Sequence, residues 1–533
     1  MNNTPSIPLF HKAVEGLKYL FLVLLAMVFL VELGLSLMWQ IETDGSALHY
    51  FAYLINEHGF VPYRDIFDPN MPGTYLFHMA VGKLFGYSDL AFRLVDVVWL
   101  TAIFIVTWLI MKPFGRVAAS ASCLLFGLIY LGAGPYMSLQ REFIAILPMA
   151  TALWLATRRE SNQSGHRTHF LCGVLFALAA LIKPHLVIGL PALIVYSCIH
   201  NSDDLKSIQR LVKSCFVGCI FALIGFLAVL VMPFLWLWQI GALESFLDIF
   251  SSYTPLYRQM SRGLEFRSPF SRLLNMVYWY IRLGGFGILL TACIFGVHLV
   301  LTRSTAVTAK RLAIFLLLLA LLYTIYVAIG GRFLDYHWMP FVYFTSLGTA
   351  LALCSASSLV PACGYRPDIL PTFGFIVTAI AVTLLPAHGA ANHLLYNKPP
   401  VPFHYDQVLE ITEYLDEHLS PTDTVQPLDW NGGALHAMRI TKAVLATPYI
   451  FDFQFYHHVS TPYIQSLRQD FLIELVHERP TFIIDVYRVG DDIARVSGID
   501  TTRDFPELRE FIAQYYEKDY AGKGFDMYRR NDN

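Results

Sequence analysis

The chain has 533 residues and a formal net charge of −2; 56% of its residues are hydrophobic and only 15% are charged. Soluble proteins carry about a quarter charged residues, so this composition excludes an ordinary soluble enzyme and indicates a polytopic membrane protein. The near-neutral charge offers no broad basic surface to nucleic acid, which is therefore not expected as a partner.

The apolar runs of the chain predict its membrane spans. The first run, Leu17 to Trp39, is long enough to cross a hydrocarbon core of about 30 Å. It is too long for the apolar h-region of a typical signal peptide, and no small-residue cleavage site follows it. Ten more apolar runs follow, at 90–111, 117–133, 142–157, 169–182, 186–199, 212–238, 283–301, 312–330, 338–354 and 369–388. The predicted fold is thus a polytopic α-helical membrane protein with about eleven transmembrane helices (one run plus ten).

The links between the runs predict the orientation. Lys and Arg concentrate in every second link, which the positive-inside rule assigns to the cytoplasm together with the N-terminus. The runs 169–182 and 186–199 flank Lys183-Pro184-His185 and count as two crossings, because the links on both sides are basic. Such a charged break at depth must be buried in protein or line a cavity. Eleven crossings place the C-terminus outside, and a bacterial inner membrane is the expected location.

Residues 390–533 have an ordinary soluble composition and predict an extracytoplasmic α/β domain. "TFIIDVY" at 481–487 predicts a strand, and Pro506 predicts the start of a helix. Helical spacing relates two groups of apolar residues, Val408, Ile411, Leu415 and Leu419, and Leu467, Phe471, Leu475 and Val476. The expected division is a transmembrane catalytic domain at 1–389 and an outer domain at 390–533, with the boundary near 386–400.

The eight cysteines do not suggest a disulfide framework. Seven lie in or beside apolar runs, Cys363 lies in a short loop, and the long polar C-terminal segment has none. No CxxC pair and no Cys/His metal spacing occurs. These cysteines are expected to pack as small side chains between helices.

The first outer loop, residues 41–89, has the most unusual polar content. An apolar stripe of Ala47, Tyr50, Phe51 and Leu54 predicts an amphipathic helix lying in the membrane interface. Asp44, just before this stripe, fits two roles. It could cap a helix that begins near Ser46, or it could be a general base held at the membrane surface.

Other ionisable residues fall on the same predicted outer side. Asp65 suits either a turn or a substrate contact, and Asp68, next to Pro69, suits a turn. Each cation near a span end could be an anchor that reaches for water. Together they suit a cavity for an anionic lipid headgroup, because Arg and Lys both bind phosphate. The residues in question are Arg93, Arg141 beside Glu142, Lys183, His185, Arg258, Arg332 and His337.

Motifs of other chemistries do not occur. The sequence contains no GxxxxGK[ST] phosphate loop, no HExxH and no GxSxG. His457-His458 is too small a pattern to predict a metal site.

Several motifs resemble the GT-C superfamily of membrane glycosyltransferases. They include G-x-x-P-Y-R-D-x-x-x-x-x-x-P at Gly59 to Pro72, G-x-S-x-x-A-x-R-L-x-D at Gly86 to Asp96, "LIKPH" and "DYHWMP". The nearest groups are the dolichyl-phosphate-mannose protein mannosyltransferases and the bacterial aminoarabinose lipid A transferases. The resemblance extends over essentially the whole chain.

This resemblance implies inverting transfer of a hexosyl or pentosyl group from a polyprenyl-phosphate donor to a hydroxyl of a lipid, glycan or protein acceptor. Asp44 would match the catalytic carboxylate, and Glu142 the second acidic residue. The implied phosphate and substrate contacts come from Arg93, Arg141, Lys183, His185, Arg258, Arg332, His337, Tyr63 and Asp65. Many mannosyltransferases have Asp-Glu at the first site. This chain has Asp44-Gly45, so no metal is assigned, and a divalent cation is the one cofactor considered.

Two other classes of protein fit parts of the pattern. A flippase or transporter of a lipid-linked sugar would use the same cations, although inverted repeats and paired broken helices would be expected. The sequence shows one such broken pair, at 169–199. A receptor with an outer sensing domain would not need so many cations near the membrane.

Overall fold

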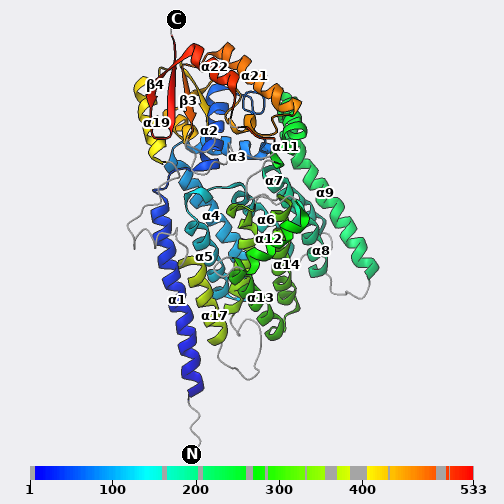
Figure 1. Cartoon of the computed structure of the whole chain (residues 1–533). Coiled ribbons are helices and arrows are strands. Elements are labelled where there is room, and N and C mark those ends of the chain that lie inside the picture. Colours follow the sequence, from blue (N-terminus) through cyan, green and yellow to red (C-terminus); the bar gives the residue numbers. More distant parts are fainter. Residues whose placement is uncertain are drawn as a thin grey trace, which may run out of the picture. The chain divides into compact units, whose positions relative to one another are not determined.

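The structure is a computed structural model (Figure 1). It describes residues 6–158, 165–201, 208–259, 268–281, 286–330, 333–354, 369–384, 405–429, 433–487, 500–502 and 504–531. The chain forms two compact units. The first comprises Met1–Trp39, Arg93–Val231 and Phe266–Pro400, and the second comprises Gln40–Phe92, Met232–Glu265 and Val401–Asn533. The boundary predicted near 386–400 lies outside the described residues.

The first unit consists of helices, and every predicted apolar run overlaps one of them. Their bounds are α1 Ser6–Ser36, α4 Asp89–Met111, α5 Arg116–Gly132, α6 Arg141–Thr157, α7 Gly165–Ile182, η3 Pro184–Ile188, α8 Gly189–Asn201, α9 Ile208–Gln239, α12 Pro269–Ile281, α13 Phe286–Arg303, α14 Val307–Gly330, η5 Asp335–Trp338, α15 Met339–Ala350, η6 Leu351–Leu353, α17 Ile369–Ala379 and η7 Ile380–Leu384. Single turns η1 Lys112–Phe114 and η2 Pro135–Met137 flank α5. Two helices, α4 and α9, continue into the second unit.

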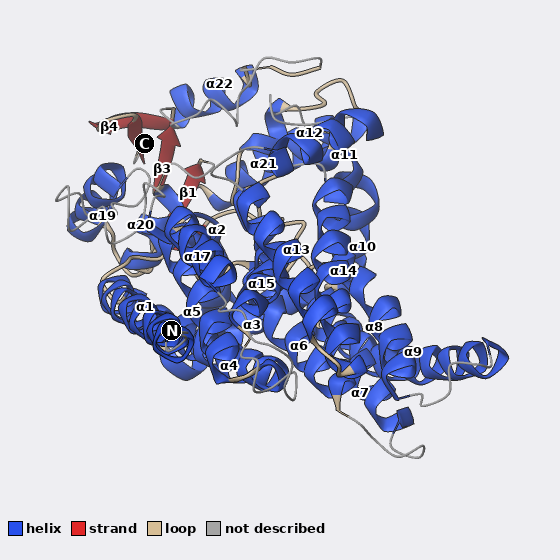
Figure 2. Ribbon diagram, turned by 90° about the horizontal axis from the view of Figure 1, so that it is seen from below, coloured by secondary structure: helices blue, strands red, loops and turns tan. Residues whose placement is uncertain are grey.

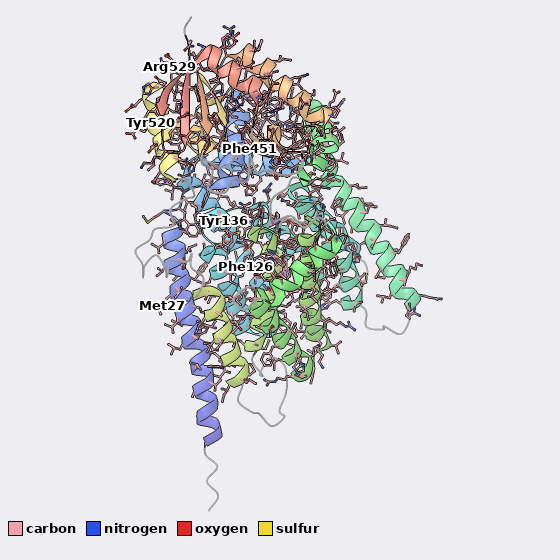
Figure 3. All side chains as sticks on the ribbon, in the orientation of Figure 1. Met27, Phe126, Tyr136, Phe451, Tyr520 and Arg529 are labelled. Carbon is pink, nitrogen blue, oxygen red and sulfur yellow. The ribbon has the colours of Figure 1, made fainter. Side chains whose placement is uncertain are left out.

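Several of these helices suit a lipid environment. In the described part of the chain, five helical stretches are long and apolar enough to cross a membrane: Ala13–Ser36, Asp89–Phe114, Gly165–Ile182, Ile208–Gln239 and Val307–Gly330. Helix α1 leaves large apolar side chains uncovered, such as Met27, which is 50% exposed, whereas Phe126 in α5 is fully buried (Figure 3). These five candidate spans support a multi-pass membrane protein, and the count of eleven crossings and the orientation of the termini remain predictions.

Small residues allow close helix packing in this unit, as is common between membrane helices. A Cβ added to Gly173 of α7 would overlap the backbone of Ala222 in α9, and one added to Gly348 of α15 would overlap the Sγ of Cys293 in α13. The seven cysteines within the described ranges are free thiols. Cys293 thus occupies the kind of position expected for the cysteines, as a small side chain between helices.

The second unit contains one five-stranded sheet (Figure 2). Its order is β2-β1-β3-β5-β4, with β1 parallel to β2 and β3, and β5 antiparallel to β3 and β4. The strands are β1 Thr424–Leu428, β2 Val444–Leu445, β3 Phe482–Val486, β4 Tyr516–Ala521 and β5 Phe525–Arg530, and the helices of the same segment are α19 Tyr405–His418, α20 Ala434–Thr441, η8 Phe453–Tyr456, α21 Pro462–Glu478 and α22 Pro506–Tyr515.

Local sequence patterns anticipated parts of this segment. Strand β3 lies within 481–487, and α22 begins at Pro506 as predicted. The predicted helical spacings fall on α19 and α21, where Ile411, Leu415 and Phe471 are buried. The location of this segment outside the membrane remains a prediction.

The first outer loop forms two helices, α2 Thr43–His58 and α3 Pro72–Phe85, and the remaining helical turns of this unit are α10 Leu243–Asp248, η4 Ile249–Tyr253 and α11 Thr254–Arg258. The expectation that lipid covers the apolar stripe of α2 is wrong, and its position at the membrane interface remains a prediction. Its apolar stripe is buried in a protein core with residues of the C-terminal segment. The Tyr50 Oη donates to the Ala443 carbonyl at 2.8 Å, and the Tyr53 Oη donates to that of Lys442 at 3.2 Å. Either lipid or protein can cover an amphipathic stripe, and here protein covers it.

Of the two roles considered for Asp44, the helix cap is wrong. Helix α2 begins at Thr43, so that Asp44 lies inside the first turn and Glu42 occupies the N-cap position without a side-chain cap. A carboxylate in the first turn still interacts favourably with the helix dipole. Asp44 is therefore carried on a regular helix rather than on a flexible link.

Candidate functional site

Glu142, in the first turn of α6, is the centre of a buried polar cluster in the first unit. Its side chain is fully buried, and its Oε1 accepts a 2.5 Å hydrogen bond from the Tyr326 Oη of α14. The Lys183 Nζ lies 3.5 Å from the same oxygen, and the His337 Nε2 of η5 lies 3.7 Å from it. Three helices and one helix break thus converge on one carboxylate.

The break between α7 and α8 brings Lys183 to this cluster. Pro184 prevents α7 from continuing, because proline lacks an amide hydrogen and restricts the residue before it. Lys183 has the extended backbone of a residue preceding a proline, with φ −144° and ψ 101°. Its side chain is 22% exposed, whereas that of Glu142 is 0% exposed. The ammonium group therefore pairs with a buried carboxylate and still reaches the surface of the protein.

A second buried network supports the turn before α6. The Leu139 amide donates to the Asp96 Oδ1 at 3.3 Å and to the Tyr130 Oη at 3.2 Å. Leu139 has a φ of 47°, a left-handed conformation that is uncommon for leucine. Asp96 also accepts hydrogen bonds from the Tyr130 hydroxyl and the Arg93 guanidinium. The network therefore holds a strained turn just ahead of Arg141 and Glu142.

Arg93, a predicted phosphate ligand, is part of this network. It is fully buried, pairs with Asp96 at 2.5 Å and donates from Nε to the Ser36 carbonyl at 2.9 Å. It also donates to Ser138 and lies over the ring of Trp39. These contacts favour a structural role for Arg93 over the predicted phosphate contact.

Asp44 lies in the second unit, where a buried arginine binds residues around it. The Arg439 Nη2 of α20 lies 2.6 Å from the Asp89 Oδ1, and its Nη1 donates to the Tyr87 carbonyl at 2.7 Å. The Arg439 Nε lies 3.4 Å from the Ser46 Oγ, and the Asp89 Oδ1 also accepts the Ile41 amide at 3.2 Å. Asp44 is thus flanked along the chain by two anchored residues.

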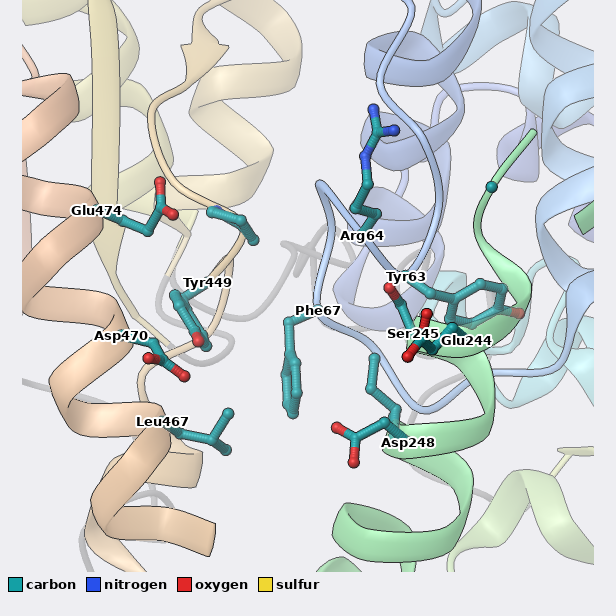
Figure 4. Close-up of a pocket in the computed structure, with 13 residues that line it drawn as sticks. Tyr63, Arg64, Phe67, Glu244, Ser245, Asp248, Tyr449, Leu467, Asp470 and Glu474 are labelled. Atoms are coloured by element: carbon teal, nitrogen blue, oxygen red, sulfur yellow. The ribbon is translucent and has the colours of Figure 1, made fainter. Parts of the chain in front are cut away.

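The second unit also contains a pocket of about 560 Å³ (Figure 4). Figure 4 shows Tyr449, Asp470 and Glu474 facing Tyr63 and Asp248 across it. The Tyr63 Oη donates to the Asn70 carbonyl at 2.8 Å, and burial, with Asp68 nearby, raises the pKa of this phenol well above its usual value. The pocket thus combines aromatic rings with carboxylates, and Tyr63 is one of the predicted substrate contacts that lines it.

The other predicted site residues differ in burial and in their contacts. Asp65 accepts the Val61 amide at 2.8 Å and pairs with Arg64, which matches its turn reading. Arg258 is exposed at the end of α11, and His185 is partly buried in η3. Arg332 lies outside the described residues. The structure therefore brings together Glu142, Lys183 and His337 in one unit, and places Asp44, Tyr63, Asp65 and Arg258 in the other.

Sequence reasoning missed two important residues. Tyr326 lies in a leucine-rich span and gives no local signal, and Arg439 lies in an ordinary soluble helix. Only contacts between distant parts of the chain reveal them. Within the described ranges, no three His, Cys, Asp or Glu side chains group as metal ligands.

Comparisons with known proteins agree with this architecture. The profile of the dolichyl-phosphate-mannose-protein mannosyltransferase family matches residues 69–234. No curated protein gives a significant match. The crystal structure of ArnT from Cupriavidus metallidurans bound to undecaprenyl phosphate superposes with a TM-score of 0.61 at 11% identity, covering 97% of this chain and 98% of that one. The apo structure of the same protein gives a TM-score of 0.52 at 13% identity, with the same coverage.

At such low identity the structural likeness shows the fold. The fold is that of ArnT over nearly the whole chain, and the mannosyltransferase profile covers the stretch that contains α3 to α8 and most of α9. The resemblance inferred from the sequence motifs is thus supported by a family profile over residues 69–234 and by the fold of ArnT over nearly the whole chain.

Proposed function

We propose that the chain is an inverting glycosyltransferase that moves a sugar from a polyprenyl-phosphate donor to an acceptor hydroxyl, on the outer face of a bacterial inner membrane. The observation that carries this proposal is the Lys183–Glu142–His337 cluster at a helix break in a GT-C-like fold. A solved structure with this fold binds undecaprenyl phosphate, which supports a donor of that class.

Asp44 is the proposed general base. It removes the proton of the acceptor hydroxyl as the hydroxyl oxygen attacks the anomeric carbon of the donor sugar. The new glycosidic bond forms as the bond from the anomeric carbon to the phosphate oxygen breaks, and the polyprenyl phosphate leaves with the electron pair. Because the leaving group is a stable anion, no general acid is needed. Its position in the first turn of a packed helix supports Asp44 in this role.

Lys183 is the proposed phosphate ligand. An ammonium group stabilises negative charge best where it is held in place and partly shielded from water. Lys183 meets both conditions, since it lies 3.5 Å from the buried Glu142 carboxylate and is only 22% exposed. His337 lies next to the same carboxylate, and its imidazole adds a second positive charge near the phosphate when it is protonated.

Glu142 is the proposed organiser of these cations rather than a proton carrier. A buried carboxylate is costly unless it is paired and hydrogen-bonded. Tyr326 and Lys183 supply these partners to Glu142. The carboxylate in turn restrains the Lys183 side chain, which would otherwise lose conformational entropy on binding phosphate.

The test is a cleavage assay with the full chain in lipid nanodiscs. A panel of radiolabelled polyprenyl-phosphate sugars is supplied, and the release of polyprenyl phosphate is measured with and without candidate acceptors. The proposal predicts release from at least one donor, to an acceptor or slowly to water. Movement of an intact donor across proteoliposome membranes without cleavage would instead identify a flippase.

A further inference from the structure

Arg439 joins the C-terminal segment to the far end of the first outer loop. Its guanidinium lies 2.6 Å from the Asp89 carboxylate and donates to the Tyr87 carbonyl at 2.7 Å. The Arg439 side chain is 3% exposed. The Asp89 side chain is 28% exposed. The contact is nevertheless held by the guanidinium, because separating the pair would leave the Arg439 charge buried and unpaired.

The same contact reaches the beginning of the loop. The Asp89 Oδ1 accepts the Ile41 amide at 3.2 Å, across 48 positions of the chain. The Arg439 Nε lies 3.4 Å from the Ser46 Oγ in the first turn of α2. Asp44 lies between Ile41 and Ser46, so the Arg439–Asp89 pair restrains the chain on both sides of this carboxylate.

The buried histidines near Arg439 do not carry a competing positive charge. His49 of α2 and His436 of α20 lie nearby and are buried. Burial, aided by the charge of Arg439, lowers the pKa of His49 to about 3, and the same causes lower the pKa of His436. Both imidazoles are therefore neutral at physiological pH and do not compete for the Asp89 carboxylate.

We propose that Arg439 is a positioning residue that, through Asp89 and Ser46, holds Asp44 in the geometry required to remove the acceptor proton. The C-terminal segment is then part of the catalytic apparatus rather than an appended domain. This inference rests on the proposed function, since it takes Asp44 as the base. An arginine is needed because its planar fork makes three separate contacts, which a lysine cannot reproduce.

The experiment compares Arg439→Met and Arg439→Lys with a matched control, Arg468→Met, in the full chain in nanodiscs. Arg468 is also an arginine of the C-terminal segment, but it donates to the Asp504 carbonyl at 2.6 Å and lies over the ring of Phe505, away from the loop contacts. Initial rates of polyprenyl phosphate release give kcat and the donor KM. Hydrogen exchange reports the protection of the Ile41 amide and of the first turn of α2.

Arg439→Met is expected to lower kcat on the order of 10- to 100-fold, because a misplacement of about 1 Å has that effect. The donor KM should not change, since Lys183 is untouched. The Ile41 amide should exchange faster, and Arg439→Lys should recover part of kcat. Arg468→Met should leave kcat and the exchange of Ile41 as in the unchanged chain.

The outcomes separate this inference from the proposed function. If Asp44→Asn keeps full activity, the assignment of the base fails, and with it the inference. If Asp44→Asn is inactive while Arg439→Met has the original kcat, the proposed function stands and the positioning role is overturned. Should Arg439→Met fail to fold, the lysine variant decides: faster exchange at Ile41 with unchanged kcat also overturns the inference.

Discussion

The Tyr326 Oη donates a 2.5 Å hydrogen bond to the Glu142 Oε1, and both side chains are buried among the helices of the first unit. The bond joins α6 to α14, 184 positions apart in the chain. The bond replaces one of the hydrogen bonds that the carboxylate would make with water. Losing the donor to a buried carboxylate destabilises the folded protein.

Tyr326→Phe should destabilise the protein by about 1–3 kcal/mol, because it removes a donor from a buried carboxylate. The measurement is the free energy of unfolding, or the shift in thermal midpoint, in one detergent. Tyr343→Phe is the matched control, since that phenol is equally buried but bonds a neutral hydroxyl, that of Thr107, at 2.9 Å. Equal stability losses in the two variants would argue against a special role for the Glu142 contact.

Lys183→Gln should slow the release of polyprenyl phosphate on the order of 100-fold, because it removes the cation proposed to stabilise the leaving phosphate. Some loss of stability should accompany it, since Glu142 loses a charged partner. The assay is the initial rate of release in nanodiscs, normalised to folded protein. Lys112→Gln, at an exposed lysine of η1, is the control and should keep the original rate. Normal turnover in Lys183→Gln would remove this residue from the mechanism.

Asp96→Asn should destabilise the protein by about 3–5 kcal/mol, because it breaks a fully buried ion pair with Arg93. It also weakens the acceptor that holds the left-handed Leu139, so activity per folded molecule should fall as well. Thermal unfolding and release rates measure the two effects. The exposed pair of Arg509 and Asp504 gives the control, and Arg509→Gln should change stability by about 0–1 kcal/mol.

How far the sequence predicted the structure depends on the range of the interactions. Apolar runs predicted the helices of the first unit, and "TFIIDVY" and Pro506 predicted β3 and the start of α22, because periodicity and backbone chemistry act locally. The sequence could not predict that protein rather than lipid contacts the apolar stripe of α2, since both environments favour the same apolar residues. Nothing local to Arg439 or Tyr326 indicates a partner some 350 or 184 positions away, respectively.

His49 should make stability depend on acid. Its pKa is lowered from 6.5 to about 3 by burial, so between these values the unfolded chain binds a proton that the folded chain does not. The contribution of the neutral His49 to the free energy of unfolding is fully present above pH 6.5. It decreases as the pH falls toward 3, by at most about 5 kcal/mol. Thermal midpoints from pH 7 to pH 4.5 measure the effect. His49→Phe should flatten the profile, because the ring lies among Tyr87 and Phe92; an unchanged slope would contradict this origin.

The most direct test of the account compares the unchanged chain with Asp44→Asn in the release of polyprenyl phosphate from a labelled polyprenyl-phosphate sugar. The account predicts turnover by the unchanged chain and a rate lower by about 100-fold or more in the variant, because a general base contributes about that factor. The variant should fold and insert normally, since Asp44 is only partly buried and Asn keeps nearly the same side-chain shape. Equal rates in the two proteins would contradict the account.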